Sequence, residues 1–364
     1  MRSAHKALLA IATLLSGAAL AQTTTTPAPT GTVTGGTGTP IAQAAPLGTD
    51  AAFQAYLGTL RAKARAMGIR DATMDSVFPT LTVNPRVIQL DRSQPGGSFD
   101  ALIPPFEPYR LQHVDAQRIG RGRMAYAANR SKLAAIEAQT GVPEQIMVAI
   151  YGHETNYGAF TGDFDLLRSL GTLAYEGRRR SLFEPEFLAT LKMFDSGIPR
   201  SQLIGSWAGA TGFPQFLPTV YLRVAKDGDG DGRANIWTSE ADALASIANY
   251  FVDAGWRKGE PWGVPVSVPA TFNRASVASR STPPRCVRVF SRHSRWLTMA
   301  EWRQRGIVPT GASLPESTLA TLLEPDGPGK TAYLLTGNYR VILDYNCSNF
   351  YALSVGLLAD AVKN

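Results

Sequence analysis

The sequence contains few cysteines and histidines, and this scarcity excludes several kinds of site. Among 364 residues there are two cysteines and four histidines, and they do not follow the spacing of zinc ligands. The formal net charge is only +7. A surplus of this size could favour binding to an anionic polymer, but it is equally typical of an ordinary soluble protein. The one dense basic run is Arg178-Arg179-Arg180, whose simplest interpretation is a solvated turn. We therefore expect no zinc centre and no nucleic-acid partner.

Long hydrophobic runs are missing beyond the first 21 residues. Those residues combine a basic start, an apolar core at 8–15 and the small-residue site Ala19-Leu20-Ala21, which predicts a signal peptide at 1–21. The core is too short to span a bilayer comfortably, and no lipid-acceptor cysteine follows it. Residues 22–49, rich in Thr, Pro and Gly, predict a disordered tether. We expect an exported, soluble monomer in the periplasm or cell envelope, without a transmembrane segment in the mature chain.

The two cysteines are Cys286 and Cys347. An even number of cysteines in an exported protein favours a disulfide. Two buried free thiols are the alternative.

Apolar periodicity predicts a helical body followed by a small region with strands. Helices are expected at 50–68, 115–139, 166–175, 183–195, 200–207 and 242–254, and strands at 264–268, 287–290, 332–335 and 339–343. Asp115 can cap the second helix, and the first has an apolar stripe made of Phe53, Leu57, Leu60 and Ala64. A final helix is expected at 349–362. The predicted class is α+β and mainly α, with a catalytic body at 50–255, a β-containing subdomain at 256–345, and residues 346–364 returning to the body.

Glu154 is a carboxylate on the apolar face of a predicted helix. Met147, Ile150 and Tyr151 share that face at helical spacing. Burial raises the pKa of a carboxyl group, so Glu154 is suited to hold a proton near neutral pH and to act as a general acid. The alternative is a structural carboxylate bonded to backbone or to an arginine.

The segment Asp227-Gly228-Asp229-Gly230-Asp231-Gly232 matches the opening of an EF-hand loop. Carboxylates at positions 1, 3 and 5 suit one hard cation, and Arg233 would add its backbone carbonyl. Position 12, normally a glutamate, is Thr238, so the loop is either longer, ending at Glu240 or Asp242, or incomplete. A solvated acidic turn is the alternative to a structural metal site.

Small residues dominate the segment Gly205–Pro218, which also contains Ser206, Trp207, Phe213 and Gln215. Small side chains permit close approach of a ligand or of another helix. Polar groups beside flat apolar faces suit a sugar chain. Composition alone would favour a tightly packed helix junction.

Together these segments resemble the lytic transglycosylase B family, lysozyme-like enzymes that cut bacterial murein. The resemblance covers about residues 50–362, with its motifs in the same order and spacing. The motifs are Gly152-His153-Glu154-Thr155-Asn156-Tyr157-Gly158, Gly205–Pro218, Asp227–Trp237 with Ala241-Asp242-Ala243, Ser246-Ile247-Ala248-Asn249-Tyr250, and Tyr345-Asn346-Cys347-Ser348-Asn349-Phe350-Tyr351-Ala352.

The resemblance implies a role for each residue that matches a family motif. Glu154 would be the catalytic acid, and the substrate would be the glycan strands of peptidoglycan. No cofactor is implied for catalysis, whereas the metal loop would hold structural calcium or sodium. The implied substrate-binding residues are Ser206, Gln215, Tyr250, Tyr345, Tyr351, Tyr109, Asn346, Arg178 and Arg179, and the implied metal ligands are Asp227, Asp229, Asp231, Arg233 and, as the last one, Asp242.

The resemblance also implies a reaction that needs one carboxyl group. Glu154 would protonate the bond between N-acetylmuramic acid and N-acetylglucosamine and then, as a base, help to form a 1,6-anhydro end. A hydrolytic muramidase using Asp163 or Asp165 as a second carboxylate, and a non-catalytic wall-binding protein, are the alternatives. The chain departs from the family at His153, Thr211 and Phe213 and by lacking a lipid-acceptor cysteine.

Overall fold

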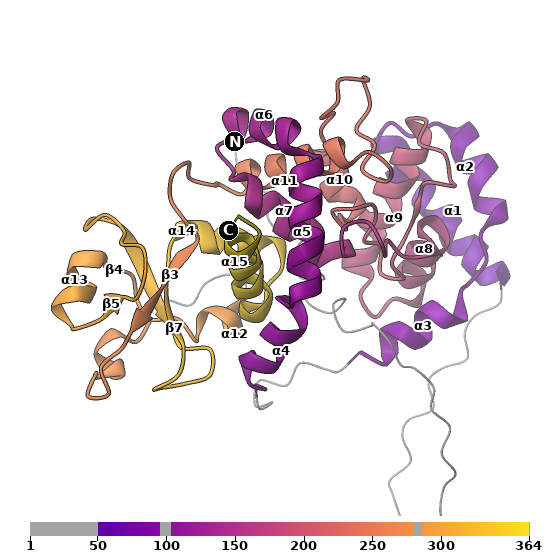
Figure 1. The fold of residues 1–364 in the computed structure, drawn as a ribbon. Coiled ribbons are helices and arrows are strands. Elements are labelled where there is room, and N and C mark those ends of the chain that lie inside the picture. Colours follow the sequence, from indigo (N-terminus) through magenta and orange to yellow (C-terminus); the bar gives the residue numbers. More distant parts are fainter. Residues whose placement is uncertain (1–49, 95–102, 280–285, 364) are drawn as a thin grey trace, which may run out of the picture.

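The computed structural model describes residues 50–94, 103–279 and 286–363 (Figure 1). The predicted signal peptide and tether lie outside these residues. Across the described ranges, no helix combines the length and apolar character needed to cross a membrane.

A body of helices makes up most of the described chain, with a short two-stranded sheet on it. Strands β1 (Phe164–Asp165) and β2 (Ile204–Gly205) pair antiparallel. The body contains α1 (Asp50–Ala66), α2 (Asp71–Val77), the 3-10 turn η2 (Phe78–Thr80), α3 (Pro85–Arg92), α4 (Phe106–His113), α5 (Ala116–Ala128), α6 (Arg130–Thr140), α7 (Glu144–Thr155), α8 (Leu166–Glu176), α9 (Arg180–Asp195), α10 (Pro218–Val224), α11 (Glu240–Asp253), α14 (Gly337–Tyr345) and α15 (Asn349–Lys363).

A separate sheet forms the second part, which Figure 1 shows beside α15 and away from α1 and α2. Its strand order is β4-β6-β7-β3-β5, and neighbouring strands are antiparallel. Its own apolar core includes Val264, Trp302 and Leu334. The elements are β3 (Gly263–Ser267), the 3-10 turn η3 (Arg274–Val277), α12 (Val287–Phe290), β4 (Leu297–Thr298), α13 (Met299–Gln304), β5 (Val308–Pro309), β6 (Leu319–Leu323) and β7 (Ala332–Leu335).

Several predicted elements are confirmed where one face is clearly apolar. In α1, the predicted stripe of Phe53, Leu57, Leu60 and Ala64 is fully buried.

Asp115 caps α5 by accepting from the backbone N–H groups of residues 117 and 118. The long helix predicted from this cap is instead two helices, since it breaks at Asn129, which has non-helical torsions and donates through its side chain to Glu240 Oε2 at 2.6 Å.

Three further predictions are wrong. Residues 287–290 and 339–343, expected as strands, belong to helices α12 and α14. In α14 the β-branched residues that favoured a strand are overridden by tertiary packing, because Tyr339 and Ile342 are fully buried in the core of the helical body. Helix α12 is a single short turn without a buried residue. Residues 200–207, expected as a helix, instead contain β2. The backbone of Ala210 lies so close to Gly205 that a Cβ at this position would be only 2.1 Å from the Ala210 carbonyl oxygen.

Helix α15 lies inside the body and brings the end of the chain to the other motifs. It packs against α7 and α5, as Figure 1 shows, and its residues Tyr351, Leu353 and Val355 are buried. Cys286 and Cys347 form a disulfide whose Cα atoms are 5.8 Å apart. The bond joins the start of α12 to the turn just before α15.

Candidate active site and metal loop

Glu154 lies in the last turn of α7 and faces α15. The hydroxyl of Tyr351 donates to its Oε1 at 2.5 Å. The side chain is partly accessible, as contact with a substrate oxygen requires, but the protein packed around it removes most of its hydration. This desolvation raises the pKa of Glu154 to about 7, and the hydrogen bond from Tyr351 offsets part of the rise.

Tyr351 remains a hydrogen-bond donor at physiological pH. Burial and the nearby charge of Glu154 raise the pKa of its hydroxyl well above its usual value. A neutral phenol beside a carboxyl group that titrates near 7 is an arrangement suited to general acid and base chemistry.

His153 forms part of a stack of rings beside this pair. Its ring lies 5.4 Å from Tyr351 and 5.9 Å from His113, which in turn stacks 3.8 Å from Tyr109. Burial lowers the pKa of His153 to about 3, so its imidazole is neutral at pH 7 and cannot supply the proton. Tyr109, a predicted substrate-binding residue, is thus connected to Glu154 through His113, His153 and Tyr351. No role for either histidine was predicted from the sequence.

A second aromatic group holds the segment that contains Gln215. Tyr345 donates its hydroxyl to the carbonyl of Pro214 at 2.5 Å. Its ring lies 4.7 Å from Tyr250 and 6.0 Å from Phe216. Two predicted substrate-binding tyrosines therefore contact each other, and the ring of Phe216, the residue after Gln215, lies near both of them.

The segment of small residues folds back on itself next to the loop that follows Glu154. Ser206 accepts at its hydroxyl from the N–H of Ala210 at 3.0 Å. Gln215 donates to the carbonyl of Thr161 at 3.2 Å and to that of Gly212 at 2.9 Å. Ser206 and Gln215 thus belong to a turn that is bonded to the Glu154 loop.

Strained backbone gathers at the same place. Among the non-glycine residues that the structure describes, four have positive φ, namely Asn156, Tyr157, Gln215 and Cys286. The first two lie two and three residues after Glu154, and the third lies in the predicted sugar-binding turn. Such conformations cost of order 1–3 kcal/mol and persist where the surrounding structure imposes them, often at functional sites.

Asn346 is buried between Tyr345 and the disulfide-bonded Cys347, with only 4% of its surface exposed. It caps the C-terminal end of α14. Its place in the turn before α15 is fixed by the bond between Cys286 and Cys347.

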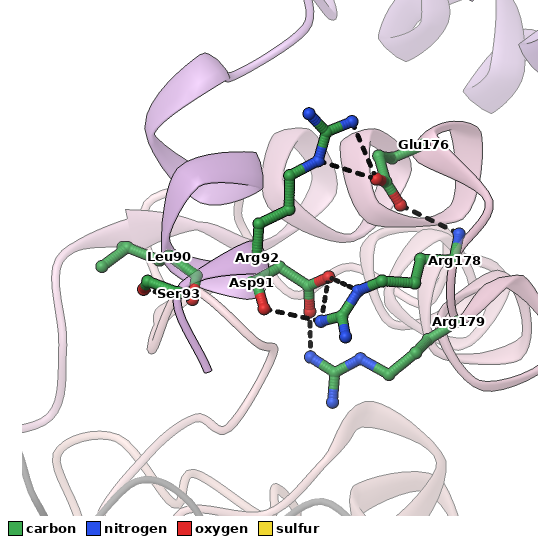
Figure 2. Close-up of polar contacts among 7 residues, drawn as sticks. All are labelled: Leu90, Asp91, Arg92, Ser93, Glu176, Arg178 and Arg179. Carbon is green, nitrogen blue, oxygen red and sulfur yellow. Dashed lines mark hydrogen bonds and ion pairs between the residues drawn. The ribbon is translucent and has the colours of Figure 1, made fainter. Parts of the chain in front are cut away.

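Arg178 and Arg179 are held by a buried carboxylate rather than by the residues around Glu154. Figure 2 shows both guanidinium groups turned toward Asp91 of α3, which is 1% exposed. Arg178 donates through Nε to Asp91 Oδ2 at 2.7 Å and through a terminal nitrogen to the Asp91 carbonyl at 2.6 Å. Substrate contact by this pair remains a prediction.

The acidic loop brings together carboxylates from both of its ends. Ligand atoms of Asp227, Asp229 and Asp242 lie within 4.8 Å of one another. Asp242 is fully buried, and its two oxygens accept from the N–H groups of Gly228 and Asn235. Clustered carboxylate oxygens of this kind suit a hard cation such as calcium. Asp231 and Arg233 are exposed residues of the same loop.

Glu240, the other candidate for the last ligand, points elsewhere. Its Oε1 accepts from the hydroxyl of Tyr151 on α7 at 2.9 Å, and its Oε2 accepts from Asn129. Trp237 of the same loop donates to the Thr211 hydroxyl at 2.8 Å. The acidic loop is thereby bonded to both the Glu154 helix and the segment that contains Gln215.

Comparisons with known proteins identify the family of the chain. A family model described as Transglycosylase SLT domain matches residues 52–360. Membrane-bound lytic murein transglycosylase B of Escherichia coli strain K12 is 29% identical over 292 residues, which are 79% of this chain and 72% of that protein.

Solved structures show the same likeness. SltB3 from Pseudomonas aeruginosa in complex with NAG-anhNAM-pentapeptide is 39% identical, with a TM-score of 0.76 over 86% of this chain and 80% of that chain. The Escherichia coli lytic transglycosylase Slt35 in complex with calcium is 26% identical, with a TM-score of 0.68 over 86% and 93% of the two chains. The predicted mainly α, lysozyme-like fold is confirmed. The chain belongs to the transglycosylase SLT domain family and is a lytic transglycosylase that cleaves peptidoglycan.

Proposed function

We propose that Glu154 performs both proton transfers of murein cleavage. As an acid, it protonates the glycosidic oxygen between N-acetylmuramic acid and N-acetylglucosamine while the bond from that oxygen to the anomeric carbon breaks. The ionised Glu154 then takes the proton of the muramoyl 6-hydroxyl, whose oxygen bonds to the anomeric carbon. The product is a 1,6-anhydromuramoyl end, and no water is consumed.

The observation that carries this proposal is the pairing of Glu154 with Tyr351. A pKa of about 7 leaves the carboxyl group near half-protonated at neutral pH, so both of its roles are accessible. The hydroxyl of Tyr351 stabilises the ionised form by donating to Oε1. Asn346 and Ser206 would orient the substrate's acetamido group, which stabilises the positive charge that develops on the sugar.

Hydrolysis would need Asp163 or Asp165 as a second carboxylate, and the surroundings of these two residues favour the reaction with Glu154 alone. Asp165 caps α8 by accepting from the N–H of Arg168 and forms an ion pair with Arg200 at 2.7 Å, so it is engaged in holding the fold. Asp163 is exposed on the loop that follows α7. Loss of fragment release from purified sacculi in Glu154→Gln would support the proposal. Unchanged release would mean that a residue other than Glu154 protonates the glycosidic bond.

We also propose that Asp227, Asp229, Asp231, the carbonyl of Arg233 and Asp242 hold structural calcium, which sodium could replace. The carboxylate cluster and the calcium complex of Slt35 support this assignment. For the mature chain we propose a soluble monomer exported to the periplasm or cell envelope. The disulfide is in keeping with such an oxidising compartment.

A further inference from the structure

Glu240, the first residue of α11, connects this helix to the helix that carries the catalytic carboxyl group. Its Oε1 accepts from the hydroxyl of Tyr151 at 2.9 Å, and its Oε2 accepts from the side-chain amide of Asn129 at 2.6 Å. Tyr151 and Asn129 are only 2% and 4% exposed. Helix α11 packs against both α7 and α6, as Figure 1 shows. Both oxygens of Glu240 are therefore occupied by buried donors of the helical body.

Tyr151 packs against the turn at 155–158, which directly follows the catalytic carboxyl group. A Cβ on Gly158 would lie only 2.8 Å from the Tyr151 hydroxyl, so the hydroxyl fills the space that a side chain would need. The ring of Tyr151 lies 5.7 Å from Tyr157 of the turn and 5.4 Å from Phe213 of the segment of small residues. One buried ring thus contacts both the catalytic turn and the predicted sugar-binding segment.

This turn needs support because its backbone is strained. Asn156, Tyr157 and Gly158 have φ values of 50°, 60° and 82°. Residues other than glycine adopt such values at a cost, and they keep them only where the surrounding structure imposes them. The hydroxyl of Tyr157 also donates to the carbonyl of Arg118 on α5 at 3.0 Å. The place of Glu154, the residue directly before the turn, depends on these contacts.

We propose that Tyr151 and Glu240 are positioning residues, which act on Glu154 through the turn at 155–158. This inference rests on the proposed function and adds to it the residues that hold the carboxyl group in its reactive place. Because Tyr151 is buried, the effect should fall on the proton transfers rather than on substrate binding. Loss of the bond should therefore lower kcat and leave KM nearly unchanged.

The test uses three variants of the bond and one matched control. Tyr151→Phe removes only the hydroxyl, Glu240→Ala removes the acceptor, and Glu240→Gln keeps an acceptor oxygen for Tyr151. Tyr126→Phe is the control, because the Tyr126 hydroxyl donates to Glu144 in the first turn of the same helix, at its other end. The measurements are kcat and KM with glycan strands of peptidoglycan, and deuterium exchange of the turn by mass spectrometry.

We expect Tyr151→Phe and Glu240→Ala each to lower kcat about tenfold, with KM within about twofold of the wild type. A misplacement of about 1 Å can cost on the order of 100-fold, and a smaller shift is expected here. The double variant should be no slower than either single variant, because both remove the same interaction. Glu240→Gln should keep most of the wild-type rate.

The turn should exchange faster than in the wild type in Tyr151→Phe and in Glu240→Ala. Tyr126→Phe should match the wild type in both exchange and kcat. Equal losses of kcat in Tyr151→Phe and Tyr126→Phe, or losses that multiply in the double variant, would overturn the assignment. Unchanged kcat in Tyr151→Phe beside an inactive Glu154→Gln would also overturn it and leave the proposed function intact. Full activity of Glu154→Gln would refute the proposed function itself.

Discussion

The hydroxyl of Tyr351 lies 2.5 Å from Oε1 of Glu154 and links the first turn of α15 to the last turn of α7. The two residues are 197 positions apart in the sequence. Burial pushes the pKa of Glu154 upward and this hydrogen bond pushes it downward, so the pair sets the pH range in which the carboxyl group can be an acid.

Removing the Tyr351 hydroxyl should move the pH dependence of the enzyme. In Tyr351→Phe the ionised carboxylate loses its donor, so the pKa of Glu154 rises above about 7. We expect the alkaline limb of kcat/KM, where the acid becomes deprotonated, to shift to higher pH. Tyr339→Phe, a buried tyrosine bonded to Asn349, is the control and should leave the limb in place. A limb that stays fixed or moves down in Tyr351→Phe contradicts this assignment.

The raised pKa of Glu154 should also affect stability. The carboxyl titrates near 4.5 when unfolded and near 7 when folded. Below pH 4.5 it is protonated in both states and costs nothing. As pH rises through 4.5 to 7, the unfolded state ionises first, and the wild type loses up to about 3 kcal/mol.

Glu154→Gln removes this cost. We therefore expect its free energy of unfolding, measured with urea, to exceed that of the wild type by more at pH 8 than at pH 5. Burial also raises the pKa of Glu186 to about 7. Because Glu186 is present in both proteins, its contribution cancels in the difference between their free energies of unfolding. A difference that is the same at both pH values would show that Glu154 is not desolvated.

Calcium should stabilise the protein through the acidic loop. At 100 times its Kd, an ion that binds only the folded state adds about 2.7 kcal/mol, so Tm should rise with calcium and fall with chelator. Asp242→Asn should abolish the response, because Asp242 joins Asp227 and Asp229. Asp253→Asn, which alters an exposed ion pair with Arg223, should retain it. A calcium response that survives Asp242→Asn would place the ion elsewhere.

The disulfide should contribute to stability. It closes a segment of 61 residues, and bonds of this kind typically add about 2–4 kcal/mol. Reductant should therefore lower the Tm of the wild type. The double variant Cys286→Ser, Cys347→Ser should start lower and not respond. If reductant leaves the wild-type Tm unchanged, the bond does not stabilise the fold.

Local signals in the sequence were sufficient for part of the fold. The stripe of α1 and the cap at Asp115 each depend on residues within a few positions, and both are confirmed. The spacing of Asp227 and Asp229 likewise marked the acidic loop. Patterns of this kind predict well because the periodicity of a helix or a loop is read directly from neighbouring residues.

The remainder depends on contacts between distant segments. Tyr339–Leu343 resembles a strand locally, but its burial in the core accompanies a helical conformation. The neutral state of His153 arises from burial among Tyr351 and His113, which no spacing reveals. The bond from Glu240 to Tyr151 likewise joins two motifs that look independent in the sequence.

The most direct measurement of single-carboxylate chemistry is the mass of the products made from purified sacculi in water enriched in oxygen-18. If Glu154 alone serves as acid and then base, the wild type releases 1,6-anhydromuramoyl ends that carry no label. Glu154→Gln should release them at least about 100-fold more slowly. Reducing ends that contain oxygen-18 would mean that water attacks the sugar, and they would contradict the transglycosylase mechanism.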